Sequence, residues 1–237
     1  MRRKPSKEQC IGEITTGISP NTLALRTIAF VRHQLSAWRD DPDRRDEKSE
    51  DKLNLQLCKF LDSQARNSFQ MVRFDHEEYQ ADQRRVDLSA SPAKRLYLEA
   101  KPHTIYDPVL VLEGKRLPAP APDREKEYVT GLKPNRTTGG IQRFKLGLHG
   151  ARLDLSAMIG YVQERSVGHW YDKINEWILE LASGTIADGC VWKASETLEL
   201  LEEDRVDRVA SYRSVHTRTG EVASNTITLH HLWIAMN

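Results

Sequence analysis

The chain has 237 residues, of which 39% are hydrophobic and 29% are charged, and its formal net charge is +1. This balance is typical of a soluble folded domain and excludes a disordered chain. No stretch approaches the roughly 18 apolar residues that span a bilayer, and the basic N-terminus lacks the apolar run of a signal peptide. Three widely spaced cysteines fit a reducing compartment, so we expect a cytoplasmic protein. Because the charge is nearly balanced, any contact with nucleic acid must come from a local basic patch.

The first part of the chain predicts two helices after a polar arm at residues 1–20. Apolar residues recur on one face of residues 21–39, with Asn21 as the candidate N-cap. Ser49 is the candidate N-cap of a second helix, which is expected to end near Gln64.

The chain then changes to segments rich in β-branched, aromatic and leucine residues, separated by turn residues. They predict successive strands of one sheet, at residues 69–74, 84–90, 94–100 and 108–117.

The second half of the chain predicts both helices and strands. A helix is expected to begin near Gly140, a buried strand covers residues 156–163, and apolar spacing predicts an amphipathic helix over residues 168–182. Residues 209–218 and 226–236 flank a turn and predict a C-terminal β-hairpin. The order of elements indicates an α/β fold with a central mixed sheet flanked by helices.

One group of charged residues suggests chemistry. Residues i and i+2 of a strand point to the same face, so Glu113 and Lys115 project together, about 7 Å apart along the strand. Asp87 lies on another predicted strand and could meet them. Two carboxylates can hold Mg²⁺, and a neighbouring lysine can orient a water or neutralise a phosphate; a role as general base would need a strongly lowered pKa. Glu99 and Lys101 repeat the Glu-x-Lys spacing and are the alternative active pair.

The order of RRVDLSA, LVLEGKRL, EYVTG, GGIQRFKLGLHG and AMIGYVQ resembles the PD-(D/E)XK, or restriction-endonuclease-like, superfamily, and in particular bacterial nucleases of DNA restriction and phage defence. The resemblance covers roughly residues 47–182, and GKRL and GGIQRF are its most specific parts. It implies a restriction-endonuclease-like core, with residues 1–46 as an arm and helix and residues 47–237 as the nuclease domain. It also implies Mg²⁺ as the cofactor, for which Mn²⁺ could substitute, and DNA as the substrate.

Carried over residue by residue, the resemblance makes Asp87 the first metal ligand, Glu113 the second and Lys115 the catalytic lysine. Glu50 matches the helix glutamate that completes the metal site in some members. The chain departs from the pattern in having Val86 before the aspartate, and in a long interval between Asp87 and Glu113, which keeps the alternative pair open.

Basic and polar residues near these positions are candidates for binding the nucleic-acid backbone, since a helix N-terminus with basic neighbours suits a phosphate. A solvated helix face with Phe144 in the core is the competing interpretation. The candidate ligands are Arg84, Arg116, Gln142, Arg143 and Lys145, with His149 close by.

Histidines near the C-terminus suggest two further hypotheses. His216 and Arg218 share a strand face and could contact a phosphate. His230 and His231 alternate across a sheet, so they cannot both face one metal ion, and one of them is expected to be a hydrogen-bonded core residue.

Three functions remain open from the sequence. The first is a metal-dependent endonuclease of a bacterial restriction or antiviral defence system, acting alone, as an oligomer or with a partner protein of a defence complex. The second is a catalytically inactive DNA-binding or scaffolding subunit of such a system. The third is a protein-interaction module whose strand ion pairs are coincidental.

Overall fold

The computed structural model describes residues 21–80, 84–98, 101–132 and 136–237, so the predicted arm at residues 1–20 lies outside the described residues. Within them, seven strands form one sheet in the order β1-β2-β5-β6-β9-β8-β7, and β3 and β4 form a separate two-stranded sheet. The elements are α1 (Thr22–Arg39), α2 (Glu50–Ser68), β1 (Val72–Tyr79), β2 (Arg85–Pro92), β3 (Leu96–Leu98), β4 (Lys101–His103), β5 (Leu110–Leu117), the 3-10 helix η2 (Pro122–Tyr128), α3 (Gly140–Lys145), β6 (Leu155–Val162), α4 (Val167–Ala182), the 3-10 helix η3 (Ala194–Glu196), β7 (Glu199–Asp204), β8 (Val209–Thr217) and β9 (Thr226–Ala235).

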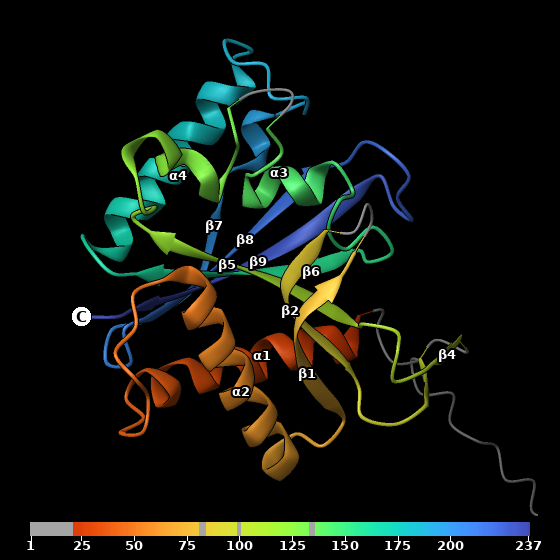
Figure 1. Ribbon diagram of the computed structural model, residues 1–237. Helices are drawn as coiled ribbons and strands as arrows, with labels where there is room; N and C mark the ends of the chain where they lie inside the picture. Colours follow the sequence, from red (N-terminus) through yellow and green to blue (C-terminus); the bar gives the residue numbers. More distant parts are fainter. Residues whose placement is uncertain (1–20, 81–83, 99–100, 133–135) are drawn as a thin grey trace, which may run out of the picture.

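The sheet lies between two layers of helices (Figure 1). α1 and α2 cover one face, where Leu35 and Leu57 belong to a hydrophobic cluster that also contains Leu112 of β5. α3 and α4 cover the other face, in a second cluster that contains Phe144 and Trp177. The structure therefore confirms the predicted α/β class, with a mixed central sheet flanked by helices.

Three neighbouring strands at the centre of the sheet are parallel: β5 pairs parallel with β6, and β6 pairs parallel with β9. The remaining pairs are antiparallel, including β2 with β5 and β8 with β9. The β8–β9 pair is the predicted C-terminal hairpin. Parallel strands buried on both faces need continuous apolar side chains, and every residue of β6 is buried.

The longer helices lie where apolar periodicity predicts them. α4 buries Ile174, Trp177, Ile178 and Leu181 on one face. Ser49 caps α2 by accepting a hydrogen bond from Lys52 N at 3.5 Å. Asn21 precedes α1 as predicted, but it is left-handed, with φ 62°, and its side chain makes no capping hydrogen bond.

One strand prediction needs correction, and one strand of the main sheet is absent from the predictions. The described part of the segment at residues 94–100 contains β3, which pairs with β4 in the small sheet and not with the main sheet. β7 was not anticipated, because its side chains are almost all exposed and the strand shows no alternation of buried and exposed residues. The boundary between residues 46 and 47 stays a prediction, although α1 and α2 contribute to the same hydrophobic cluster.

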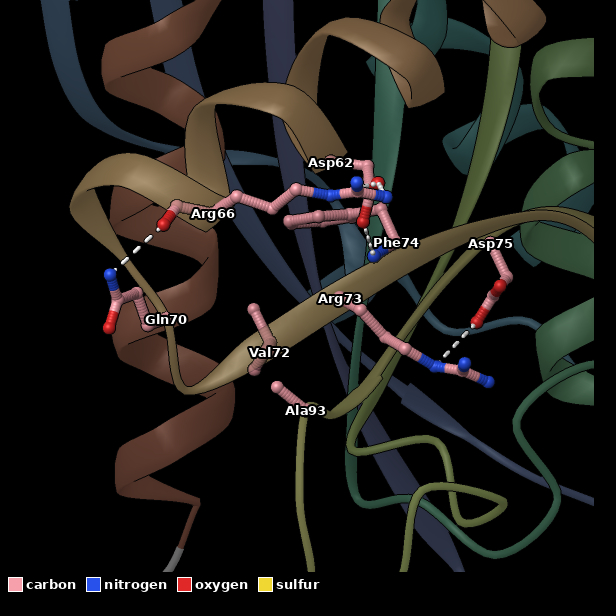
Figure 2. Close-up of a pocket in the computed structure, with 8 residues that line it drawn as sticks. All are labelled: Asp62, Arg66, Gln70, Val72, Arg73, Phe74, Asp75 and Ala93. Atoms are coloured by element: carbon pink, nitrogen blue, oxygen red, sulfur yellow. Dashed lines mark hydrogen bonds and ion pairs between the residues drawn. The ribbon is translucent and has the colours of Figure 1, made fainter.

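β1 is an edge strand of the main sheet, and α2 partly covers that edge. The pocket in Figure 2 lies there, and the Asp62 carboxylate at its rim accepts a hydrogen bond from the Phe74 N–H at 3.2 Å and pairs with Arg66. Satisfying a backbone donor of an edge strand in this way hinders pairing with another chain. No helix among the described residues is long and apolar enough to cross a membrane.

Candidate active site

The predicted Asp87 and Glu113 come together where the β2–β5 ladder ends. The last paired residues are Leu88 and Leu112, so Asp87 and Glu113 are the next residues on their strands. Instead of a further backbone bond, the Asp87 Oδ2 atom accepts a hydrogen bond from the Gly114 N–H at 2.7 Å. The side chain of Asp87 is thereby held beside the segment that carries Glu113 and Lys115.

Lys115 lies between two carboxylates from different layers of the fold. Its Nζ atom is 2.9 Å from Glu113 Oε1 and 2.8 Å from Glu50 Oε1. Glu50 is the first residue of α2, and its other oxygen accepts from the Arg116 N–H at 3.1 Å. The structure thus brings Glu50, Asp87, Glu113 and Lys115 into one cluster, although they are up to 65 residues apart along the chain.

Gly114 allows α2 to approach β5 closely. A methyl group on this residue would lie 1.9 Å from Asn54 Oδ1, and the Asn54 side chain is buried and held by the Tyr161 hydroxyl at 2.8 Å. The glycine of the Glu-Gly-Lys segment is therefore required by packing, because a larger residue would push away the helix that carries Glu50.

Charges within the cluster set the protonation states of Glu113 and Lys115. Burial opposes ionisation of Glu113, but Lys115, His149 and Arg143 outweigh it and hold its pKa well below the ordinary range. Burial likewise opposes the charged form of Lys115, but Glu113, Glu50 and Asp87 outweigh it and raise its pKa. Lys115 is thus an ammonium ion, suited to neutralising or orienting a bound group and not to accepting a proton.

The pKa of Asp87 is shifted in the opposite direction to that of Glu113. Burial of its carboxyl and the nearby negative charge of Glu113 raise its pKa to about 8, against the smaller effect of Lys115. Two carboxyl groups at one place push their pKa values apart, and proximity to a cation decides which one stays ionised. Here Glu113 holds the charge and Asp87 holds the proton.

The predicted basic ligands fall into two groups. Arg143 donates from Nη1 to Glu113 Oε1 at 2.5 Å and retains partial exposure. Arg116 follows Lys115 on β5 and is partly exposed, and Arg84 donates to the Thr137 carbonyl at 3.5 Å. Arg143 contacts the cluster directly, and Arg84 lies beside Arg143 because both donate to the Thr137 carbonyl. Arg116 is linked to the cluster through its backbone N–H, which donates to Glu50.

Gln142 and Lys145 lie inside the protein instead. Gln142 is fully buried, and it accepts from the N–H groups of Gly131 and Gly139 while donating to the Asp188 carbonyl. The Lys145 ammonium is buried against Glu196 at 2.5 Å. Neither side chain reaches the surface to meet a phosphate, so we remove both from the candidate nucleic-acid ligands.

The C-terminal histidines also form internal structure. His231 is buried and hydrogen-bonded to Tyr128 and Ser214, so it is the core histidine that the alternation predicts. His216 is buried against the same Ser214 hydroxyl, and Arg218 donates to backbone carbonyls within the protein. The hypothesis that His216 and Arg218 contact a phosphate is therefore wrong for this structure.

His149 also belongs to the cluster, although the sequence predicts no role for it at a metal ion. The fully buried side chain of His149 places Nδ1 3.2 Å from Glu113 Oε2. In the sequence, His149 is a neighbour of the predicted phosphate ligands, and it lies between Gly147 and Gly150, which have φ angles of +70° and +58°. Left-handed glycines on both sides allow the short turn that directs the imidazole inward.

The cluster fits a hard divalent cation in the chemistry of its donors but not in its present closed arrangement. Glu50, Asp87 and Glu113 supply carboxylate oxygens, and Glu113 Oε2 is buried without a hydrogen-bond partner. However, Lys115 occupies the space between Glu50 and Glu113, and no group of three acidic, histidine or cysteine side chains in the described part of the chain is arranged around a metal position.

The alternative active pair is Glu99 and Lys101, and Glu99 lies outside the described residues. The backbone of Lys101 begins β4 of the small sheet.

The chain was compared with protein-family models, with curated proteins and with solved structures. None of them matches it, so these comparisons assign the chain to no family.

Proposed function

We propose that the protein is a metal-dependent endonuclease with a restriction-endonuclease-like core, and that it cleaves DNA as an effector of a bacterial restriction or antiviral defence system. The observation that carries this proposal is the convergence of Asp87, Glu113 and Lys115 at the end of the β2–β5 ladder, with Glu50 against the same lysine. The defence context rests on the resemblance of the GKRL and GGIQRF segments alone.

In this proposal, Asp87, Glu113 and Glu50 would hold the metal ion. When bound, a divalent cation such as Mg²⁺ stabilises negative charge on the phosphate and lowers the pKa of an attacking water. Lys115 neutralises the phosphate or orients the water, because its raised pKa keeps it charged. Arg143, Arg116 and Arg84 bind the nucleic-acid backbone at the border of the cluster.

The raised pKa of Asp87 predicts a pH dependence of metal binding. Below about pH 8 the carboxyl carries a proton that a metal ion must displace. Affinity for Mg²⁺ is therefore expected to increase by up to about tenfold per pH unit as the pH rises toward that value, and to level off above it. Calorimetric titration of the wild type and Asp87→Asn at several pH values checks this. A wild-type affinity that is independent of pH would contradict it.

Cleavage itself tests the proposed function. Purified protein is incubated with supercoiled plasmid, linear duplex and single-stranded DNA, each with Mg²⁺, with Mn²⁺ or with EDTA. The proposal predicts metal-dependent cleavage that Asp87→Asn abolishes. Asp75→Asn, at a half-buried carboxylate of β1 that pairs with Arg73, is the matched control and is expected to retain cleavage. Cleavage that persists in EDTA, or in Asp87→Asn, would overturn the proposed site.

A second candidate function is a catalytically inactive DNA-binding or scaffolding subunit. The observation that favours it is the neutralisation of Glu113 by both Lys115 and Arg143, which leaves the cluster stable without a metal ion. This candidate predicts binding of the same DNA without cleavage, and an unfolding temperature that does not respond to Mg²⁺ or Mn²⁺.

A further inference from the structure

A cavity of about 550 Å³ lies beside the candidate active site. Its lining includes Val111 of β5, which is two residues before Glu113 and therefore on the same strand face, about 7 Å away along the strand. Gly150 also lines it and follows His149, whose Nδ1 atom is 3.2 Å from Glu113 Oε2. The end of β1 is tied to this loop, because Gln80 Oε1 accepts a hydrogen bond from the Gly150 N–H at 3.1 Å. A group bound in the cavity would therefore lie next to the catalytic cluster.

The exposed aromatic side chains of the described residues all lie around this cavity. Tyr79 and Tyr106 line it and are 62% and 80% exposed. Tyr97 is 67% exposed and lies on β3 opposite Pro102 of β4, which also lines the cavity. Every other tyrosine, phenylalanine and tryptophan in the described part of the chain is buried or half-buried. Exposed aromatic side chains gathered at one hollow indicate a binding surface.

Arginines accompany these tyrosines. The Arg85 guanidinium lies 4.7 Å from the centre of the Tyr79 ring and donates to the Tyr79 hydroxyl at 2.7 Å, so it fixes the ring. Arg95 lies 5.8 Å from the centre of the Tyr97 ring, and Arg152 lines the cavity itself. Proteins that hold single-stranded nucleic acid combine aromatic rings, on which bases stack, with cations that attract the backbone.

The charges within the cavity favour a base over a phosphate. Glu78 and Asp107 line it together with Arg152. The Asp107 carboxylate accepts hydrogen bonds from the N–H and hydroxyl of Thr104 at 2.8 Å and 2.7 Å, and the Tyr106 N–H donates to the same hydroxyl at 3.2 Å. Asp107 therefore shapes the turn that presents Tyr106. Two carboxylates against one arginine do not attract a phosphate, whereas a neutral planar base can stack on the tyrosine rings.

A base can enter such a cavity only when it is not paired and stacked within a duplex. The separation of about 7 Å along β5 corresponds to about two nucleotides of a stacked strand at about 3.4 Å each, so the cavity and Glu113 can hold neighbouring parts of one strand. We propose that the cavity receives an unpaired base of the strand that is cleaved, stacked on Tyr79 and Tyr106, and that the substrate is single-stranded or locally unpaired DNA. This inference rests on the proposed function, whose substrate it narrows.

DNA binding in EDTA, where no metal ion supports cleavage, tests the inference. Three labelled oligonucleotides are titrated with the protein and followed by fluorescence anisotropy: a thymine single strand, its duplex with the complementary strand, and an abasic strand of the same length. Because stacking of one base contributes a factor of about 5–100 to affinity, wild type is expected to bind the thymine strand at least about fivefold more tightly than the abasic strand or the duplex.

Variants assign that preference to the cavity. Tyr79→Ala and Tyr106→Ala are expected to lose most of it, whereas Tyr106→Phe keeps the ring and is expected to retain it. Leu25→Ala, at an exposed apolar residue of α1, is the matched surface control and is expected to bind as the wild type does. Equal affinity of the wild type for the thymine and abasic strands, tighter binding of the duplex, or unchanged binding by both alanine variants would overturn the inference.

Cross-linking gives an answer that does not depend on the variants. The wild type is irradiated with a single strand that carries 5-iodouracil, and mass spectrometry identifies the attached residue. Attachment at Tyr79 or Tyr106 supports the inference, and attachment only elsewhere overturns it. The two proposals fail differently. Base-dependent binding without metal-dependent cleavage contradicts the nuclease, whereas metal-dependent cleavage of duplex DNA that Tyr106→Ala leaves unchanged contradicts only this inference.

Discussion

Lys115→Met is expected to reduce the rate of metal-dependent DNA cleavage by about 10²–10³-fold, the size of effect seen when one preorganised electrostatic partner is removed from an active site. Methionine keeps much of the apolar stem but removes the ammonium that lies 2.8 Å from Glu50 and 2.9 Å from Glu113. Initial rates on supercoiled plasmid, at saturating Mg²⁺ or Mn²⁺, measure the effect.

The control is Lys52→Met, because Lys52 lies in the first turn of the same helix as Glu50 and pairs with Glu47 at 3.0 Å on the surface. It is expected to retain the wild-type rate. Circular dichroism of Lys115→Met establishes that the fold persists, since the substitution also leaves Glu50 without its lysine. A folded Lys115→Met that cleaves within twofold of the wild type would exclude Lys115 from the chemistry.

Lys145→Met is expected to lower the free energy of unfolding by about 3–5 kcal/mol, because it leaves a buried carboxylate without its cation. The Lys145 ammonium and Glu196 are 1% and 2% exposed and lie 2.5 Å apart. Burial opposes ionisation of Glu196, yet His216, Lys145 and the Thr217 N–H lower its pKa to about 2, so it stays charged at neutral pH. Urea unfolding followed by circular dichroism measures the loss.

Two comparisons identify the cause of that loss. The double substitution Lys145→Met with Glu196→Gln is expected to recover part of the stability, because it also removes the buried charge. Lys173→Met breaks an exposed pair with Glu176 and is expected to have little effect. A stable Lys145→Met with weakened DNA binding would instead restore Lys145 as a nucleic-acid ligand.

The sequence predicts those parts of the fold that local patterns determine. The apolar periodicity of α4 and the continuous apolar run of β6 need only neighbouring residues to be recognised. β3 was assigned to the wrong sheet because a short strand carries no local information about which partner it will pair with. β7 was missed because its side chains face solvent almost throughout.

In the candidate site, too, contacts set by local geometry can be predicted, whereas contacts between distant segments cannot be predicted from local patterns. Glu113 and Lys115 share a strand face, so their proximity follows from strand geometry. Strand order allows Asp87 to meet them, and the family resemblance predicts that it does, whereas Glu50 is predicted from the resemblance alone because it comes from a distant helix. The burial of Lys145 could not be predicted, because its partner Glu196 lies 51 residues away. His149 has no motif of its own, and only the folded turn directs it toward Glu113.

The measurement that tests the central claim most directly is cleavage of plasmid DNA by Glu113→Gln and Glu99→Gln, assayed in parallel with the wild type in Mg²⁺ and in Mn²⁺. Both substitutions keep the size of the side chain and remove only its charge. We expect metal-dependent cleavage by the wild type and by Glu99→Gln, and none by Glu113→Gln. Loss of cleavage in Glu99→Gln with activity retained in Glu113→Gln would contradict the account and move the active site to the Glu99/Lys101 pair.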